Sequence, residues 1–539
     1  MTIKFDWKNA AEIKKKEVES NIPNEWILPS EILAQYDETT PQSVLNLPKQ
    51  FLNSKEFEIT EFYTAIQLLE KLKNGEFTAI EVVKAFSHRA AIATQLTNCC
   101  TELMFDYGKK RAAFLDTYLK TNGKPYGPLH GLPISLKDSF NIPGYDSTLG
   151  YTSQIGNKPQ NKSDLVRELE DLGAVFYVKT NIPQTLMTAD SENNIFGRTL
   201  NPNNLTLTAG GSSGGEGALI KMRGSILGIG TDAAGSIRIP ALCNGVYGFR
   251  PSSRRYAHGN QMHLERDAYI DIETVAGPLS TDFETIEFLT KIIYNDESWR
   301  YDPDNFRICY QEPKIKQSDK ISIGIIIEDP ALPVHPPLQR ILREVAEKIS
   351  SNGHKIEIIE NFPSYQKSWE VAWSSFATDP KPVGFQNLVS TGEKIIKSLL
   401  LPYDVYGSGP KDIDEVIKLK AEINKIKKDW LSIYDKYDVI ISPGAPGTAP
   451  PHDTYGIAPY TTLMNVLDFP SVIIPYGKVE EDVDIGVDFE YPKILDDIYA
   501  HYSLNLYKGA PGHIQVSAPC LEDEKLLACC SIIDKVLKK

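Results

Sequence analysis

Short apolar runs alternate along this chain with stretches in which apolar residues recur every three or four positions. Residues 174–179 and 321–327 are nearly continuous apolar runs, which are typical of buried strands. Residues 337–349 follow helical spacing, and Gly353 ends this predicted helix. A second strand is expected at 354–359. This strand–helix–strand order predicts parallel pairing within a sheet.

The same periodicities predict further elements. A helix is expected to start at Thr78, because Thr78-Ala79-Ile80-Glu81 has the sequence of a capping box. Another is expected to run from Ser163 to Gly173, where glycine favours a helix end. We also expect a helix over 217–223 and strands over 226–229, 439–441 and 471–475.

The first 60 residues differ from the rest of the chain, because they are polar and punctuated by proline. We predict that residues 1–60 form an N-terminal helical extension wrapped on a larger body. No internal repeat, low-complexity tract or clear linker interrupts the remainder, so residues 61–539 are predicted to be a single domain. The expected class is α/β, with a large mixed, largely parallel sheet flanked by helices on both faces.

Composition narrows the functions that are expected. The 539 residues are 41% apolar and 24% charged, which is ordinary for a globular protein. A net charge of −14 argues against nucleic-acid binding. No apolar run approaches the ~18 residues of a membrane span, and no secretory signal opens the chain. Seven cysteines without a C-x-x-C pair indicate reduced, buried thiols in a cytoplasmic protein, and we expect neither a metal nor a cofactor.

Two glycine-rich segments carry the candidate chemistry. Gly210–Gly217 and Gly230–Pro240 each place a serine among residues with little or no side chain, so that backbone N–H groups can reach a substrate. Upstream, Lys137 ends a short apolar run at 133–136. One lysine and two loop serines are sufficient for acyl transfer without histidine.

Three other motifs resemble these loops less well. A P-loop needs a lysine directly after its glycines, and none follows here. The dinucleotide pattern has Ala233 at its third glycine position. Residues 210–214 satisfy the G-x-S-x-G pattern of the hydrolase nucleophile elbow, but residues 201–206 before it read as a loop rather than a strand.

The chemistry assigns a role to each residue. Burial would keep Lys137 uncharged, so that it could accept a proton from Ser212, which in turn takes one from Ser236. Ser236 would then attack a carbonyl carbon. The expected donors to the oxyanion are the backbone N–H groups of Ala233, Ala234, Gly235 and Ser236. Asp232 and Arg238 flank this loop and are interpreted as a structural ion pair.

The segment from Gly210 through Pro240 resembles the signature of the amidase signature family of serine hydrolases. Gly127–Asp138 resembles the lysine motif of the same family. The resemblance implies that Lys137 is the base, Ser212 the bridging serine and Ser236 the acylated nucleophile. It also implies that the amidase-signature fold covers most of residues 60–535.

Other stretches extend the resemblance. Residues 180–184 are similar to the family segment that lines the substrate cleft, which would bring Leu186, Met187 and Gly211 close to the substrate. Three segments resemble the fungal acetamidase branch, near yeast and urethane-cleaving amidases. They are the N-terminal extension, residues 193–198 and residues 442–454. Ala233-Ala234 stands where many members have Ile-Gly, which implies an intact oxyanion hole and a wider pocket.

We therefore expect an amide hydrolase that cleaves small carboxamides, or carbamates such as urethane, and releases ammonia. The expected partner is the small-molecule substrate, with no nucleic acid and no membrane. Two other hypotheses remain open, a binding or assembly subunit without catalysis and an amidotransferase subunit that acts on charged tRNA. The sequence leaves the oligomeric state open, and a homo-oligomer is one alternative.

Overall fold

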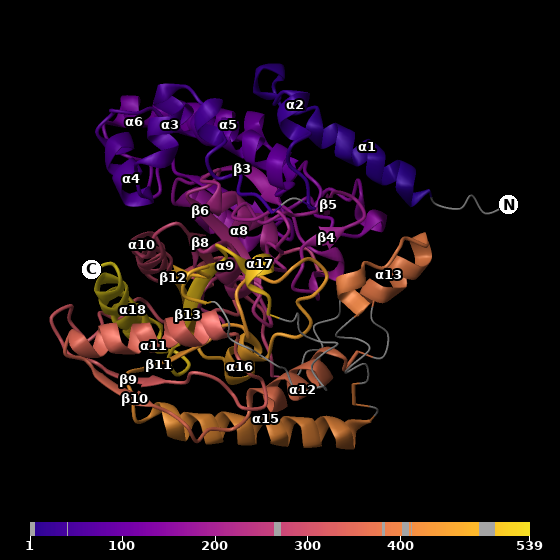
Figure 1. Cartoon of the computed structure of the whole chain (residues 1–539). Helices are drawn as coiled ribbons and strands as arrows, with labels where there is room; N and C mark the ends of the chain where they lie inside the picture. The colour runs from indigo at the N-terminus through magenta and orange to yellow at the C-terminus, as the bar shows by residue number, and fades with distance from the viewer. Residues whose placement is uncertain are drawn as a thin grey trace.

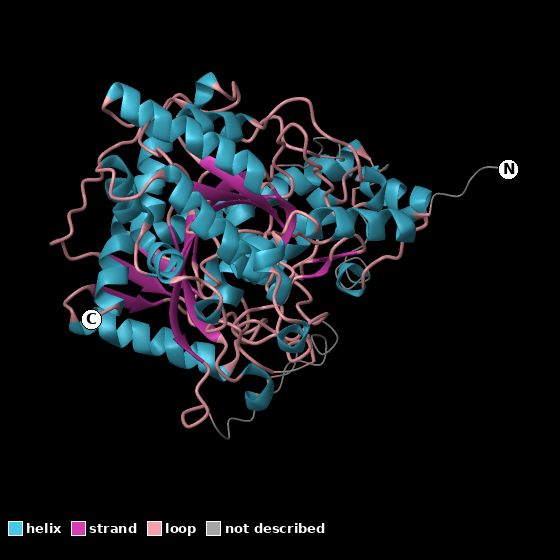
Figure 2. Ribbon diagram, turned by 90° about the horizontal axis from the view of Figure 1, so that it is seen from above, coloured by secondary structure: helices cyan, strands magenta, loops and turns pink. Residues whose placement is uncertain are grey.

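The chain folds around a twisted β-sheet with helices along both sides (Figure 2). The computed structural model describes residues 6–39, 41–263, 271–379, 383–400, 409–410, 412–484 and 502–539. Within these ranges the sheet has 11 strands. They are β1 (Cys100–Leu103), β2 (Pro133–Lys137), β3 (Val175–Thr180), β6 (Leu227–Asp232), β7 (Tyr247–Arg250), β8 (Val275–Ser280), β9 (Ser322–Ile325), β10 (Lys355–Ile358), β11 (Val439–Ser442), β12 (Ser471–Lys478) and β13 (Pro511–Ser517).

A separate two-stranded hairpin, β4 (Glu192–Asn193) and β5 (Gly197–Arg198), lies outside this sheet. The helices that cover the sheet and its edges are labelled in Figure 1. They are α1 (Trp7–Glu19), α2 (Ser30–Leu33), α3 (Ser54–Glu61), α4 (Ala65–Lys73), α5 (Ala79–Thr97), α6 (Phe105–Asn122), α7 (Asp164–Asp171), α8 (Gly214–Lys221), α9 (Arg238–Asn244), α10 (Phe283–Asn295), α11 (Pro336–Ser351), α12 (Tyr365–Phe376), α13 (Val383–Thr391), α15 (Ile413–Tyr434), α16 (Pro459–Leu467), α17 (Leu504–Tyr507) and α18 (Asp523–Leu537).

The strand order is β1-β3-β2-β6-β8-β7-β12-β13-β11-β9-β10. Parallel ladders join β2 to β3 and β6, and they join β9 to β10 and β11. Antiparallel ladders run through the centre, from β6 across β8, β7, β12 and β13 to β11. The mixed α/β class is confirmed, and the predicted parallel pairing of β9 and β10 across α11 is present.

The local patterns explain why these elements form. β2, β3 and β6 are buried at every position, as expected for strands covered on both faces. The predicted capping box at Thr78 is present, because the Thr78 hydroxyl accepts the Glu81 N–H and the Glu81 carboxylate accepts the Thr78 N–H. The predicted helix after Ser163 is α7, which begins at Asp164.

Apolar residues of the N-terminal extension belong to the main hydrophobic core. Val18, Leu28, Val44 and Ile59 pack in the same cluster as the buried residues of the sheet. The Val44 N–H donates to the Pro202 carbonyl at 3.0 Å, which fastens the extension to the body. The domain boundary at residue 60 stays a prediction.

None of the helices in the described ranges combines the length and the apolar character needed to cross a bilayer. All seven cysteines are free thiols. Cys309 and Cys520 are exposed, so the expectation of buried thiols is wrong for these two.

Candidate active site

Lys137 ends β2 inside the protein. Its side chain is 0% exposed. Nζ donates to Ser212 Oγ at 2.7 Å and to Thr231 Oγ1 at 2.7 Å. The parallel pairing of β2 with β6 brings Lys137 to Thr231, which lies in β6. Ser212 reaches the same place because α8, which follows the first glycine-rich loop, packs against both strands. The predicted contact between base and bridging serine is therefore formed.

The surroundings of Lys137 favour its neutral form. Burial lowers the pKa of the Lys137 ammonium group to about 7, although the carboxylates of Asp232, Asp138 and Glu216 act in the opposite direction. A lysine with this pKa is substantially uncharged near neutral pH. It can then accept a proton, which an ordinary surface lysine cannot do.

The first glycine-rich loop lies against the segment that precedes β4. A Cβ on Gly211 would lie 2.5 Å from the Thr188 carbonyl oxygen, so no side chain fits at this position. The Gly211–Ser212 peptide bond is cis. The absence of a side chain at Gly211 lets the loop place Ser212 beside Lys137 while it stays in contact with residue 188.

The second loop is organised by a buried ion pair. Arg238 donates to both carboxylate oxygens of Asp232, at 3.0 Å each, and both side chains are fully buried. Burial alone would raise the pKa of Asp232, but the Arg238 guanidinium outweighs it and holds this pKa well below its usual range. The contacts agree with the interpretation of this pair as structural.

The N–H groups of the second loop are not equivalent. The Gly235 N–H donates to Asp232 Oδ1 at 2.8 Å, so the expectation that this group is a free oxyanion donor is not met. The Ala233, Ala234 and Ser236 N–H groups have no acceptor within the described ranges. The Ala234 carbonyl accepts the hydroxyls of Thr461 and Thr462, which fixes the loop from the opposite side.

Ser236 lies beside the first loop and is partly exposed. Its carbonyl accepts the Ser213 N–H at 3.2 Å. In the described part of the chain, no hydrogen bond joins the hydroxyls of Ser212 and Ser236, so only the first link of the expected relay is closed. Catalytic hydrogen bonds often tighten only when substrate binds, and the role of Ser236 stays a prediction.

Leu186 and Met187 follow β3 in a segment with unusual backbone geometry. Thr185 has φ 72° and Leu186 has φ 65°, which are left-handed values that residues with a bulky or branched side chain rarely adopt. Such residues cost about 1–3 kcal/mol each and persist only where their surroundings impose them. The Met187 N–H donates to Thr185 Oγ1 at 3.2 Å. The contact of these residues with substrate stays a prediction.

Comparison with known proteins identifies the family. The model of the Amidase family matches residues 81–527. An amidase of Gibberella moniliformis is 36% identical over 541 residues, which cover 99% of each chain. The chain belongs to the amidase signature family. An acetamidase of Aspergillus oryzae is 33% identical, over 98% of this chain and 99% of that one. A solved structure of fatty acid amide hydrolase matches with a TM-score of 0.91 at 31% identity, over 99% of this chain and 95% of that one.

Sequence reasoning missed two residues of this amidase site. The first is Thr231, whose hydroxyl accepts a hydrogen bond from Lys137 Nζ beside that of Ser212. Glu216 is fully buried and accepts hydrogen bonds from Ser135 at 2.5 Å and from Thr180 at 2.8 Å. Burial raises the pKa of Glu216 to about 7. Both residues lie within the glycine-rich motifs, but only the fold shows that β2, β3 and β6 converge on them.

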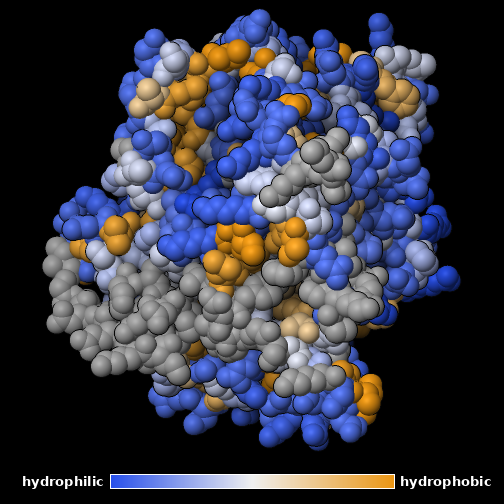
Figure 3. All heavy atoms as spheres, turned by 90° about the vertical axis from the view of Figure 1, so that its right-hand side faces the viewer, coloured by the Kyte–Doolittle hydropathy of each residue, from blue (hydrophilic) through white to orange (hydrophobic). Residues whose placement is uncertain are grey.

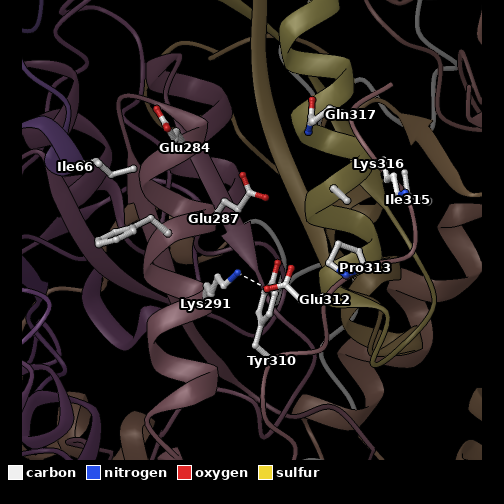
Figure 4. A pocket seen from close by; sticks show the side chains of 12 residues that line it. Ile66, Glu284, Glu287, Lys291, Tyr310, Glu312, Pro313, Ile315, Lys316 and Gln317 are labelled. Carbon is white, nitrogen blue, oxygen red and sulfur yellow. Dashed lines mark hydrogen bonds and ion pairs between the residues drawn. The ribbon is translucent and has the colours of Figure 1, made fainter. Parts of the chain in front are cut away.

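A surface cavity of the amidase lies elsewhere. It has a volume of about 500 Å³ and opens between α10, α18 and residues 310–317 (Figure 4). Glu287, Lys291, Tyr310 and Glu312 are among the residues that line it, and none of the candidate catalytic residues does. In the described ranges, no three His, Cys, Asp or Glu side chains gather in a way that could hold a metal ion.

Proposed function

We propose that this amidase hydrolyses the C–N bond of small carboxamides, and of carbamates such as urethane, through an acyl-enzyme on Ser236. The observation that carries the proposal is the buried contact between Lys137 Nζ and Ser212 Oγ at 2.7 Å. The acetamidase name of a relative that spans nearly the whole chain supports small amides as substrates. The name of the matching fatty acid amide hydrolase supports amide cleavage with a larger acyl group.

In the first half-reaction, neutral Lys137 accepts the Ser212 proton, and Ser212 takes the proton of Ser236. Ser236 Oγ forms a bond to the carbonyl carbon, and the carbonyl electron pair moves to oxygen. The Ala233, Ala234 and Ser236 N–H groups would stabilise this oxyanion, and each such donor typically contributes about 2.7–4 kcal/mol.

Collapse of the tetrahedral intermediate breaks the C–N bond. Ser212 donates its proton to the leaving nitrogen, because an unprotonated amide anion is a very poor leaving group. Lys137 then returns its proton to Ser212. In the second half-reaction, water attacks the acyl-enzyme with the same relay as base, and Ser236 recovers its proton as the acid product leaves. A primary amide or a simple carbamate releases ammonia.

An activity-based probe tests the proposal directly. A fluorophosphonate should label Ser236, and Ser236→Ala should abolish both labelling and ammonia release from acetamide, longer amides and ethyl carbamate. Labelling of Ser212 instead would contradict the assignment of the nucleophile. A folded chain that turns over no amide, ester or carbamate and takes up no probe would favour a binding subunit, and salt-sensitive retention of tRNA would favour an amidotransferase subunit.

We also propose that the enzyme acts in the cytoplasm on small molecules, without a nucleic-acid or membrane partner. Seven free cysteines and a net charge of −14 support this view. The oligomeric state stays open, with a homo-oligomer as one alternative. Size-exclusion chromatography with light scattering at several protein concentrations would separate a monomer from a homo-oligomer.

A further inference from the structure

The residues that follow α13 lie against the segment that carries Leu186. The two segments are more than 200 positions apart in the sequence. Gln184 Nε2 donates to the Lys394 carbonyl at 3.1 Å, and the Ile396 N–H donates to Gln184 Oε1 at 3.2 Å. Thr188 Oγ1 donates to the Ser398 carbonyl at 3.3 Å. The orange α13 accordingly lies beside the purple β4–β5 hairpin in Figure 1.

Glu393 is the centre of this contact. It is 6% exposed. Its carboxylate accepts the Thr152 N–H at 3.0 Å, the Thr152 hydroxyl at 2.9 Å, the Gln184 amide at 3.1 Å and the Asn194 amide at 3.0 Å. No lysine, arginine or histidine in the described ranges forms an ion pair with it. The Thr391 hydroxyl adds a fifth hydrogen bond at 3.3 Å, so neutral donors alone satisfy this buried carboxylate.

The same residues enclose a small hydrophobic cluster, which we name the wall cluster. It is separate from the main core and contains residues from both halves of the chain. Its buried members are Leu149, Tyr151, Ile182, Leu388, Ile396 and Leu399, and Leu186, Met187, Met262 and Ile395 pack against it. Where it is coloured, the face shown in Figure 3 is mainly polar, with separate apolar patches.

The wall cluster adjoins the candidate catalytic loop. The Thr188 carbonyl oxygen lies 2.5 Å from the position that a Cβ on Gly211 would take. Gly211 directly precedes Ser212. The segment 184–188 is thus held between the first glycine-rich loop and residues 391–399. The left-handed geometry of Thr185 and Leu186 needs such support, and both ends of the Gln184 amide supply it.

We propose that Glu393 is a positioning residue that seats residues 391–399 on the segment 184–188, and that the wall cluster so formed binds the apolar part of the amide substrate. This inference rests on the proposed amide hydrolysis at Ser236. It assigns the enzyme a preference for amides that carry an alkyl or aryl group over acetamide itself.

Glu393→Gln tests the positioning role. Thr152 donates to Oε1, whereas Gln184 and Asn194 donate to Oε2. The substituted amide puts an NH₂ group at one of these two positions, where it faces donors only, so at least one link must break. We expect kcat/KM for hexanamide to fall at least about tenfold, mainly through a higher KM, because a misplaced wall weakens binding more than chemistry. For acetamide we expect a change of less than about threefold, and the fluorophosphonate should label Ser236 at an unchanged rate.

Ile396→Ala tests the wall without touching the carboxylate. It should reduce the preference for hexanamide over acetamide by about tenfold, because a buried alkyl contact is lost. Glu360→Gln, at an exposed position, is the matched control and should change neither substrate. Equal losses for both amides, or no loss for either, in Glu393→Gln and Ile396→Ala would overturn the inference. If the wild-type chain neither takes up the probe nor releases ammonia, the proposed function fails instead.

Discussion

At the scale of single residues, the site depends on a lysine whose charge is suppressed. Among the described residues, the hydrogen-bond partners of Lys137 Nζ are two hydroxyls rather than carboxylates, and a hydroxyl does not stabilise an ammonium ion as an ion pair would. The Asp232 carboxylate, which is paired with Arg238, still favours the charged form of Lys137, but burial of the lysine outweighs it. A base is thereby obtained from a residue that is normally protonated.

The pH profile follows from this arrangement. Lys137 acts only when it is unprotonated, and its pKa is about 7. We therefore expect kcat/KM to be constant at alkaline pH and to fall as the pH drops through about 7, approaching a tenfold loss per unit on the acid side. Lys137→Ala should remove this acid limb and lower the alkaline rate by about 10²–10⁴-fold.

Lys221 provides the matched control for this experiment. Burial lowers its pKa as well, but among the described residues its ammonium group makes one hydrogen bond, to the Gly245 carbonyl at 3.5 Å. Lys221→Met should retain the acid limb at the same pH. The assignment is wrong if the limb survives in Lys137→Ala or disappears in Lys221→Met, as measured by ammonia release between pH 5 and 9.

Gly228 makes room for the buried carboxyl group behind the base. A Cβ at this position would lie 1.9 Å from Glu216 Oε2 and 2.6 Å from Ser135 Oγ. Gly228→Ala should lower the free energy of unfolding by about 1–3 kcal/mol through overpacking. Gly144→Ala has nothing within 4 Å of the new Cβ and should show only the cost of its φ of 93°, about 1 kcal/mol. Urea unfolding compares the two, and equal losses would mean that the clash is relieved without cost.

At the scale of elements, the capping box of α5 fixes where the first long helix of the body begins. Thr78 caps the Glu81 N–H at 3.2 Å. Thr78→Ala should lower the free energy of unfolding by about 1 kcal/mol. Thr117→Ala removes an exposed threonine from the interior of α6 and should not destabilise, because alanine is the better helix former. A loss in both variants, measured by thermal unfolding, would show that the effect is not one of capping.

The elements that the sequence predicts are those with local signals. The cap of α5 and the β9–α11–β10 unit depend on neighbouring residues, and both are present. β8 has no such signal, because it contains Gly277 and Pro278, which are unfavourable in a strand interior. It forms because all six of its residues pair with β6. The antiparallel centre of the sheet is therefore a product of long-range pairing.

The residues of the site also fall into those with a local sequence signal and those without one. Lys137, Ser212 and Ser236 stand in recognisable motifs, so their types and spacing were sufficient to nominate them. Glu393 is an ordinary glutamate in sequence, and its partner Thr152 lies 241 positions away. No local pattern can report a contact of that kind, and the wall of a pocket is built mainly from such contacts.

At the scale of the whole molecule, the N-terminal extension reaches the same wall. Lys14 of α1 is 1% exposed, and Nζ lies 2.6 Å from Glu102 Oε1 and 3.2 Å from Asp146 Oδ2. Asp146 also accepts Lys179 Nζ through its carbonyl at 2.5 Å. Residues 147–149 continue directly into the wall cluster, so the buried lysine of the extension supports a loop of the candidate site.

Removing this lysine should therefore destabilise the entire fold. In Lys14→Met, the buried carboxylates of Glu102 and Asp146 lose the ammonium group that pairs with both, and breaking a buried ion pair from one side costs about 3–5 kcal/mol. Lys15→Met changes an exposed neighbour on the same helix and should stay within about 0.5 kcal/mol. Urea unfolding at pH 7 measures the free energy of unfolding of both variants. If Lys14→Met loses no more than Lys15→Met, the buried lysine of the extension does not stabilise the fold.

The pH dependence of Lys14→Met separates lost charge pairing from lost packing. Burial raises the pKa of Glu102 even with Lys14 present, and loss of the cation must raise it further. A carboxyl group whose pKa is higher in the folded than in the unfolded state binds more protons when folded, so it favours folding as the pH falls. The deficit of Lys14→Met relative to wild type should consequently shrink between pH 8 and pH 5. A deficit that stays constant over this range would assign the loss to packing of the lysine stem instead.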